Sequence, residues 1–66
     1  MPIISVQLLH GRAPELKRKL MQELAQAAVR TLGVPEDSVR VILAEIDPAH
    51  WGIGTKSKAE IESRAV

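Results

Sequence analysis

The chain has 66 residues, a formal net charge of +1 and no cysteine, which limits it to one small domain without disulfide bonds. In so short a chain the gain from apolar burial roughly balances the entropy lost on folding, and small proteins usually make up the difference with disulfides, bound metals or oligomerisation. His10 and His50 are too few and too isolated to suggest a metal site, so oligomerisation remains. The near-neutral charge and the single aromatic residue argue against a nucleic acid partner. The sequence has no apolar run long enough to span a membrane and no signal-peptide pattern, which argues against a membrane partner and favours a cytoplasmic protein.

The first predicted element is a β-strand over residues 3–9. Ile4, Val6 and Leu8 make one parity of this segment apolar, whereas the other parity is mixed. The pair His10-Gly11 ends the strand. We therefore expect one face of the strand to lie in the core.

Residues 14–32 predict a helix. Pro14 suits the first helical position, and Gly33 is a typical residue just past a helix end. Apolar side chains recur at intervals of four and define the face expected to pack on the strands: Leu16, Leu20, Leu24, Ala28 and Leu32. Charged residues such as Lys17 are expected on the side that faces solvent.

Residues 39–46 predict a second strand, in which side chains of both parities are apolar. A strand of this kind is covered on both faces. A strand, a crossover helix and a second strand form a right-handed parallel βαβ unit, and its helix covers one face only. We therefore predict a small α/β (α+β) subunit that buries its other face against further copies, in at least a dimer.

The whole chain, residues 1–66, is predicted to form a single domain. Gly52 and Gly54 indicate a tight turn or small hairpin after the second strand. The polar residues 55–66 form either a loose tail or a short helix, because Ser57 and Glu60 have the spacing of a capping box.

Pro2 is the first candidate for chemistry. It follows the initiator methionine, which is usually removed before a small residue. Removal would leave the proline nitrogen as a free secondary amine, which is both a base and a nucleophile and is held rigid by its ring. Taken alone, Pro2 also has an ordinary explanation as the start of an edge strand.

Two arginines strengthen the case for Pro2. Parallel strands place Pro2 and Arg40 toward the same end of the sheet, whereas Arg12 lies more than about 20 Å from Pro2 at roughly 3.3 Å per residue. The three can meet only if a neighbouring subunit runs antiparallel and brings its own Arg12. The two guanidinium groups and apolar surroundings would lower the pKa of the proline amine and keep it neutral, and the cations would suit a dianionic substrate.

The residues named so far coincide with a known pattern, which runs in unbroken register over residues 1–54. It consists of Met1-Pro2-Ile3-Ile4, His10-Gly11-Arg12, Ser38-Val39-Arg40-Val41-Ile42, Glu45 and His50-Trp51-Gly52-Ile53-Gly54. With these residues the sequence resembles the 4-oxalocrotonate tautomerase family of the tautomerase superfamily.

The resemblance implies a homohexamer of βαβ subunits that works without a cofactor and uses Pro2 as general base. It implies that Arg12 binds the distal carboxylate of the substrate and that Arg40 binds the near carboxylate and the 2-oxygen. Trp51 would form an apolar wall that helps to lower the proline pKa, and we place Leu9 with the substrate-binding residues. The implied reaction is the tautomerisation of an unsaturated 2-hydroxy or 2-oxo acid such as 2-hydroxymuconate.

Residues 51–54 contain no carboxylate that could activate water, which favours isomerisation over hydration. Two alternatives stay open: a superfamily relative that acts on another unsaturated acid, and a catalytically silent oligomeric module with the same fold. The mass of the mature chain distinguishes an active enzyme from the catalytically silent module, because a retained Met1 turns the proline nitrogen into a non-basic amide.

Overall fold

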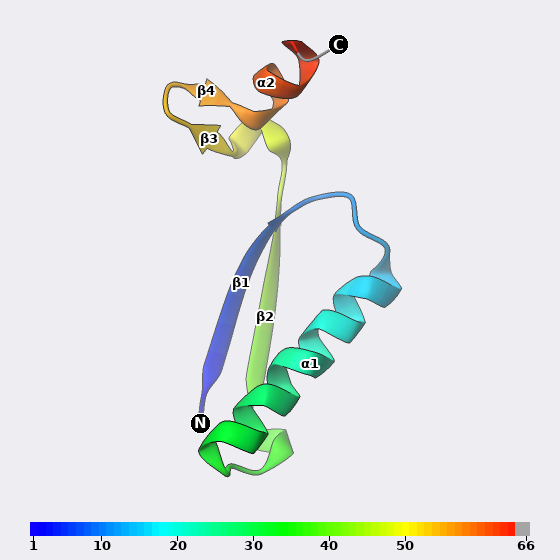
Figure 1. The fold of residues 1–66 in the computed structure, drawn as a ribbon, viewed down its shortest axis with the longest axis vertical. Helices are drawn as coiled ribbons and strands as arrows, with labels where there is room; N and C mark the ends of the chain where they lie inside the picture. Colours follow the sequence, from blue (N-terminus) through cyan, green and yellow to red (C-terminus); the bar gives the residue numbers. More distant parts are fainter. Residues whose placement is uncertain (65–66) are drawn as a thin grey trace.

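The computed structural model describes residues 1–64. In chain order they form β1 (Ile3–Leu9), α1 (Pro14–Leu32), the 3₁₀ turn η1 (Glu36–Ser38), β2 (Arg40–Ile46), the 3₁₀ turn η2 (Pro48–His50), β3 (Gly52–Ile53), β4 (Lys56–Ser57) and α2 (Lys58–Arg64) (Figure 1). Strands β1 and β2 pair in parallel, with Ile3 opposite Arg40 and Leu9 opposite Ile46. The predicted βαβ unit with parallel strands is therefore confirmed.

Local signals place the boundaries of these elements. Pro14 opens α1, and Gly33 ends it with a φ of 68° while its N–H donates to the carbonyl oxygen of Val29 at 2.9 Å. Strand β2 begins one residue later than predicted. The N–H of Val39 donates to the carbonyl oxygen of Glu36 at 3.3 Å and closes η1, so this residue does not join the sheet.

Helix α1 packs on the strands through a face that differs in part from the predicted one. Leu20 and Leu24 are half-buried as expected, but Leu16 and Leu32 are 61% and 60% exposed. Lys17, predicted to face solvent, instead contacts a side chain of β2. The reason is geometric, since each interval of four residues advances by about 40° around a helix of 3.6 residues per turn. The two ends of so long a stripe therefore face different directions.

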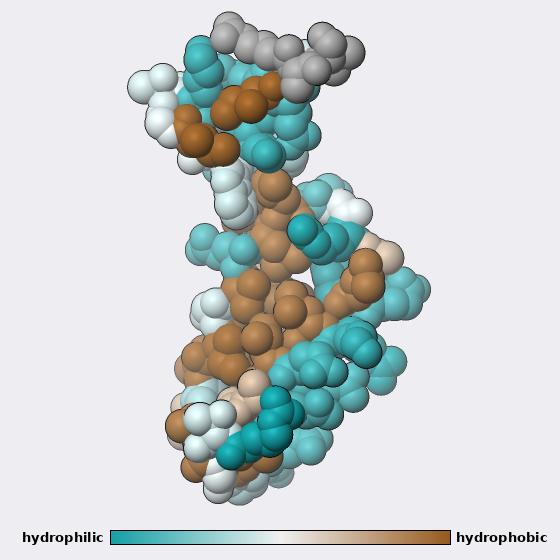
Figure 2. Space-filling view, viewed as in Figure 1, coloured by the Kyte–Doolittle hydropathy of each residue, from teal (hydrophilic) through white to brown (hydrophobic). Residues whose placement is uncertain are grey.

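The face of the sheet away from α1 is uncovered. Ile3 and Ile42 lie on it and are 63% and 55% exposed, whereas the described residue with the most complete burial is Leu8, on the side toward α1. Figure 2 shows apolar side chains gathered along the strands beside the polar outer surface of α1. The residues of β2 on the second apolar face were predicted to need a cover, and within residues 1–64 no element covers them.

The dimensions of the chain agree with this exposure. Its radius of gyration is 15.5 Å and its extents are 46 × 24 × 14 Å, whereas a compact domain of this length has a radius of gyration of about 11 Å. Its accessible surface is 5150 Å², compared with roughly 4,100 Å² for a folded monomer of this mass. The isolated chain thus leaves apolar surface that a compact domain would bury.

The C-terminal part lies beyond the carboxyl end of β2, away from α1 (Figure 1). Strands β3 and β4 pair antiparallel and form the predicted small hairpin, with Gly54 at a φ of 64° in its turn. Ser57 and Glu60 form a capping box at the start of α2: the Glu60 N–H donates to Ser57 Oγ at 3.2 Å, and the Ser57 N–H donates to Glu60 Oε1 at 3.5 Å. Residues 65 and 66 of the predicted tail lie outside the described residues. None of the helices within residues 1–64 has the length and apolar character that a bilayer span requires.

Candidate active site

Pro2 and Arg40 lie together at the amino ends of the two parallel strands. The backbone N–H of Arg40 donates to the carbonyl oxygen of Pro2 at 3.0 Å. Pro2 is half-buried, and Met1, which blocks its nitrogen as an amide, is 80% exposed. The parallel register therefore places an arginine beside the residue whose nitrogen becomes a free amine when Met1 is removed.

The side chain of Arg40 is held by the turn that precedes its strand. Its Nη1 donates to the backbone carbonyl oxygen of Asp37 at 2.6 Å. That turn is itself fixed by Ser38, whose Oγ donates to the carbonyl oxygen of Pro35 at 2.7 Å. A guanidinium has five N–H donors in a planar fork, so this contact leaves donors that can bind carboxylate or enol oxygen.

Leu9, Arg12 and Trp51 all lie toward the opposite end of the sheet. Arg12 lies in the loop between β1 and α1, where Gly11 adopts a φ of 129° that suits glycine. The Arg12 Nη1 donates to the carbonyl oxygen of Leu9 at 3.2 Å, and the Arg12 side chain is exposed. Trp51 follows η2, beyond the end of β2, and is half-buried.

A pocket lies beside Trp51. Asp47 caps η2, because its Oδ1 accepts a hydrogen bond from the backbone N–H of Ala49 at 2.8 Å. This bond fixes the backbone turn that leads to Trp51. The pocket has a volume of about 260 Å³ and is lined by Gln7, Ile46, His50, Trp51 and Gly52. Because Gln7 and Ile46 belong to the parity of the strands that faces away from α1, the pocket opens on the uncovered face of the sheet.

One chain does not bring all five predicted site residues together. Pro2 and Arg40 are separated from the other three by the length of β1, whose seven residues span about 23 Å at roughly 3.3 Å per residue. The sequence predicts this separation for Arg12, and the structure adds that Trp51 lies at the same end as Arg12. A second chain, running in the opposite direction, is predicted from the sequence to complete the set.

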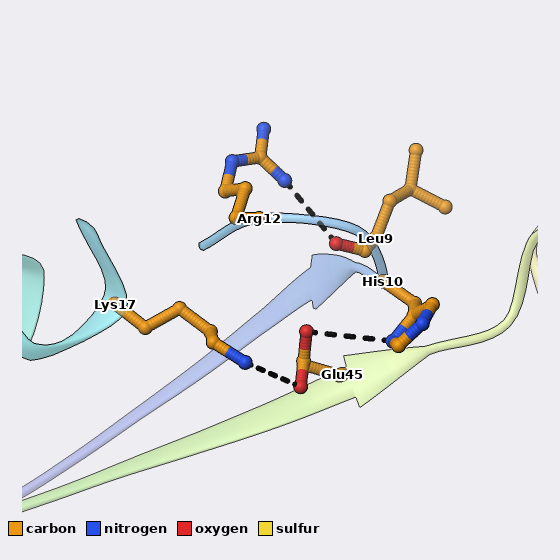
Figure 3. A network of polar contacts seen from close by, with 5 residues as sticks. All are labelled: Leu9, His10, Arg12, Lys17 and Glu45. Atoms are coloured by element: carbon orange, nitrogen blue, oxygen red, sulfur yellow. Dashed lines mark hydrogen bonds and ion pairs between the residues drawn. The ribbon is translucent and has the colours of Figure 1, made fainter. Parts of the chain in front are cut away.

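The sequence predictions give no role to Glu45, which forms a charged cluster near Arg12 (Figure 3). Its Oε1 accepts a hydrogen bond from Lys17 Nζ at 2.8 Å, and its Oε2 lies 3.6 Å from His10 Nδ1. A signal for this cluster was present in the sequence. Glu45 is the one acidic residue of β2, at the parity of residues that face the helix, and such a side chain needs a partner.

The cluster keeps Glu45 ionised. The hydrogen bond from Lys17 holds the pKa of this carboxyl below its usual value of 4.5, against a smaller opposing effect of burial, and the charges of Lys17 and His10 and the backbone N–H of Gly11 lower it further. A lowered pKa means that the carboxylate stabilises the fold above about pH 4.5 and that this contribution is lost as the pH falls through the lowered value.

The sequence has clear relatives among known proteins. Residues 2–61 match the family described as tautomerase enzyme. A probable tautomerase of Ralstonia nicotianae is 51% identical over 59 residues, which cover 89% of this chain and 84% of the relative. A 2-hydroxymuconate tautomerase of Stutzerimonas stutzeri is 43% identical over 61 residues, which cover 92% of this chain and 97% of the relative.

Solved structures agree with the sequence relatives. TomN, a 4-oxalocrotonate tautomerase homologue of the tomaymycin biosynthetic pathway, has a TM-score of 0.92 at 42% identity, covering 98% of this chain and 100% of that chain. A heterohexamer 4-oxalocrotonate tautomerase from Chloroflexus aurantiacus has a TM-score of 0.85 at 38% identity, covering 92% of this chain and 98% of that chain. Because the family match spans nearly the whole chain and the fold is shared, this protein belongs to the tautomerase superfamily, as an enzyme of the 4-oxalocrotonate tautomerase family.

Proposed function

We propose that the protein is a cofactor-independent tautomerase that uses Pro2, after removal of Met1, as general base on an unsaturated 2-hydroxy or 2-oxo acid such as 2-hydroxymuconate. The observation that carries the proposal is the placement of Pro2 with Arg40 at one end of the sheet and of Arg12 with Trp51 at the other. With an uncovered apolar face between them, this placement supports a site built by antiparallel subunits. The activity named for the Stutzerimonas stutzeri relative supports the substrate class.

The proposed reaction moves one proton. The neutral amine of Pro2 takes the proton of the 2-hydroxy group, and the electron pair of the O–H bond forms the C2 carbonyl while the conjugated double bonds shift. The protonated amine then returns the proton to carbon, which gives the conjugated 2-oxo acid and restores the neutral amine. Arg40 stabilises the negative charge that develops on the 2-oxygen. The proton and electron balance closes without an oxidant, a reductant or a cofactor.

The other site residues act from the neighbouring subunit in this proposal. Arg12 binds the distal carboxylate of a diacid, since a guanidinium matches a carboxylate with paired hydrogen bonds. Leu9 and Trp51 form an apolar wall around the reacting carbons. Exclusion of water and the nearby guanidinium groups both disfavour the protonated amine, which lowers the pKa of Pro2 toward neutrality.

The assembly that this site requires is itself a prediction. We expect a concentration-dependent multimer, a homohexamer in the cytoplasm, because burial of Ile3 and Ile42 needs further copies of the sheet. The heterohexameric enzyme of Chloroflexus aurantiacus supports this stoichiometry. Sedimentation velocity over a range of concentrations measures it directly. A stable folded monomer at micromolar concentration would contradict both the assembly and the shared site.

Substitution of Arg12 tests the proposed binding role. Arg12→Ala should raise the KM for the diacid 2-hydroxymuconate by about ten- to a hundredfold, the loss expected for hydrogen bonds between charged groups, with a small effect on kcat. A monoacid enol without the distal carboxylate is the matched control substrate, and its KM should change little. Both are assayed with protein whose mass shows that Met1 is absent. If the unsubstituted protein without Met1 turned over neither substrate, the result would favour the catalytically silent module.

A further inference from the structure

Glu45 joins two elements that are distant in sequence. It lies on the side of β2 that faces α1, where its side chain is 27% exposed and that of Lys17 is 23% exposed. One carboxylate oxygen accepts the 2.8 Å hydrogen bond from Lys17 in α1, and the other lies 3.6 Å from His10 in the loop that follows β1. Figure 3 shows the carboxylate between the side chains of Lys17 and His10, close to the loop that carries Arg12.

Within residues 1–64, few other hydrogen bonds connect the loop between β1 and α1 to the rest of the protein. Its backbone is tied to β2 at His10, whose N–H donates to a carbonyl oxygen at the end of that strand at 2.9 Å. Gly11 then adopts a φ of 129°, which glycine reaches readily because it has no Cβ atom. In the part of the chain that the structure describes, the side chain of Arg12 donates to the carbonyl oxygen of Leu9, the last residue of β1, so this contact links the loop to β1 but not to β2. The Glu45 side chain adds a second tie between this loop and β2, beside the backbone hydrogen bond of His10.

The start of α1 adds little restraint of its own. Ala13 occupies the N-cap position and makes no side-chain hydrogen bond to the helix, although such bonds commonly fix the entry of a chain into a helix. Lys17, about one turn inside α1, makes a side-chain hydrogen bond through which β2 holds this end of the helix. Glu45 thus restrains the loop from both sides.

We propose that Glu45 is a positioning residue that holds the loop between β1 and α1, through His10 and Lys17, so that Arg12 is preorganised for the distal carboxylate of a substrate. Glu45 does not touch the substrate. This inference rests on the proposed function, in which Arg12 binds that carboxylate. It extends the site to a residue on the opposite side of the sheet from the pocket at Trp51.

The role predicts a selective effect on binding. A loop that is not held must be ordered when the diacid binds, and the ordering entropy is subtracted from the binding free energy. Proton transfer at Pro2 takes place at the other end of the chain and depends on Arg40, so kcat should change little. A monoacid that does not engage Arg12 should be bound as before.

The test uses Glu45→Gln, which keeps the size of the side chain and removes its charge, with Glu23→Gln on the exposed side of α1 as the matched control. The assays use protein that lacks Met1 and whose assembly is verified by sedimentation. In this protein Glu45→Gln should raise the KM for 2-hydroxymuconate about three- to tenfold, whereas kcat and the KM for the monoacid should stay within about twofold of their original values. Glu23→Gln should change none of these constants. Lys17→Met, which keeps the packing of the stem and removes the ammonium, should act in the same direction and serves if Glu45→Gln fails to fold.

A double-variant comparison separates this inference from the proposed function. In an Arg12→Ala background, Glu45→Gln should have no further effect on the diacid KM, because the group that it positions is absent. If Arg12→Ala raises the diacid KM but Glu45→Gln and Lys17→Met do not, the positioning role is overturned and the function stands. An equal rise for diacid and monoacid would show a general structural role and overturn the inference. If Arg12→Ala changes nothing, the proposed binding role of Arg12 fails and the positioning role fails with it.

Discussion

Protein that retains Met1 should lose nearly all tautomerase activity, by about 10²- to 10⁴-fold in kcat/KM, which is the usual contribution of a general base. When Met1 is retained, the nitrogen of Pro2 belongs to an amide and cannot accept a proton. When Met1 is removed, the same nitrogen is a secondary amine. The measurement is kcat/KM on 2-hydroxymuconate for two preparations, one from cells with methionine aminopeptidase and one from cells depleted of it, each verified by mass.

Pro2→Ala is the control for this prediction. After removal of Met1 it presents a primary amine in a similar position, so we expect partial activity that exceeds the activity of Met1-retained protein. This ranking of the activities distinguishes the effect of the basic nitrogen from the effect of the shape of the proline ring. Full activity in a sample that retains Met1 would show that Pro2 is not the base, and the proposed mechanism would then be wrong.

Arg40→Ala should lower kcat by about 10²- to 10³-fold, the cost of removing a donor that stabilises developing negative charge on oxygen. It should also move the acidic limb of the pH profile. Loss of the neighbouring cation favours the protonated amine, so the pKa of Pro2 rises. Only the neutral amine accepts a proton, so the acidic limb of kcat/KM shifts to higher pH. A pH–rate profile of the two proteins measures both effects.

Two further variants control the Arg40 prediction. Arg40→Lys keeps the charge but loses the planar fork, so it should leave the acidic limb near its original pH while kcat falls in part. Arg18→Ala removes an exposed cation of α1 and should change neither quantity. If Arg40→Ala left both kcat and the acidic limb unchanged, Arg40 would have no role in the chemistry.

The sequence by itself determined the secondary-structure elements and the end of the sheet at which each candidate residue lies. Apolar alternation gave β1, and Pro14 and Gly33 bounded α1, because these signals act through the backbone of a few neighbouring residues. Since a strand, a helix and a strand return the chain in parallel, the pairing of Pro2 with Arg40 followed from the order of the elements. The two apolar faces of residues 39–46 likewise predicted the face that α1 leaves uncovered.

Only the tertiary structure decided how these elements meet. The spacing of residues on α1 allows several rotations of the helix on the sheet, and the structure turns Lys17 inward while Leu16 and Leu32 stay exposed. The contact between Lys17 and Glu45 joins residues that are 28 positions apart, and no local pattern fixes such a pair. The place of Trp51 beside Ile46 depends in the same way on the turn at η2 and on the hairpin after it. Local backbone preferences set which elements form, whereas side-chain packing between distant segments sets which residues share a site.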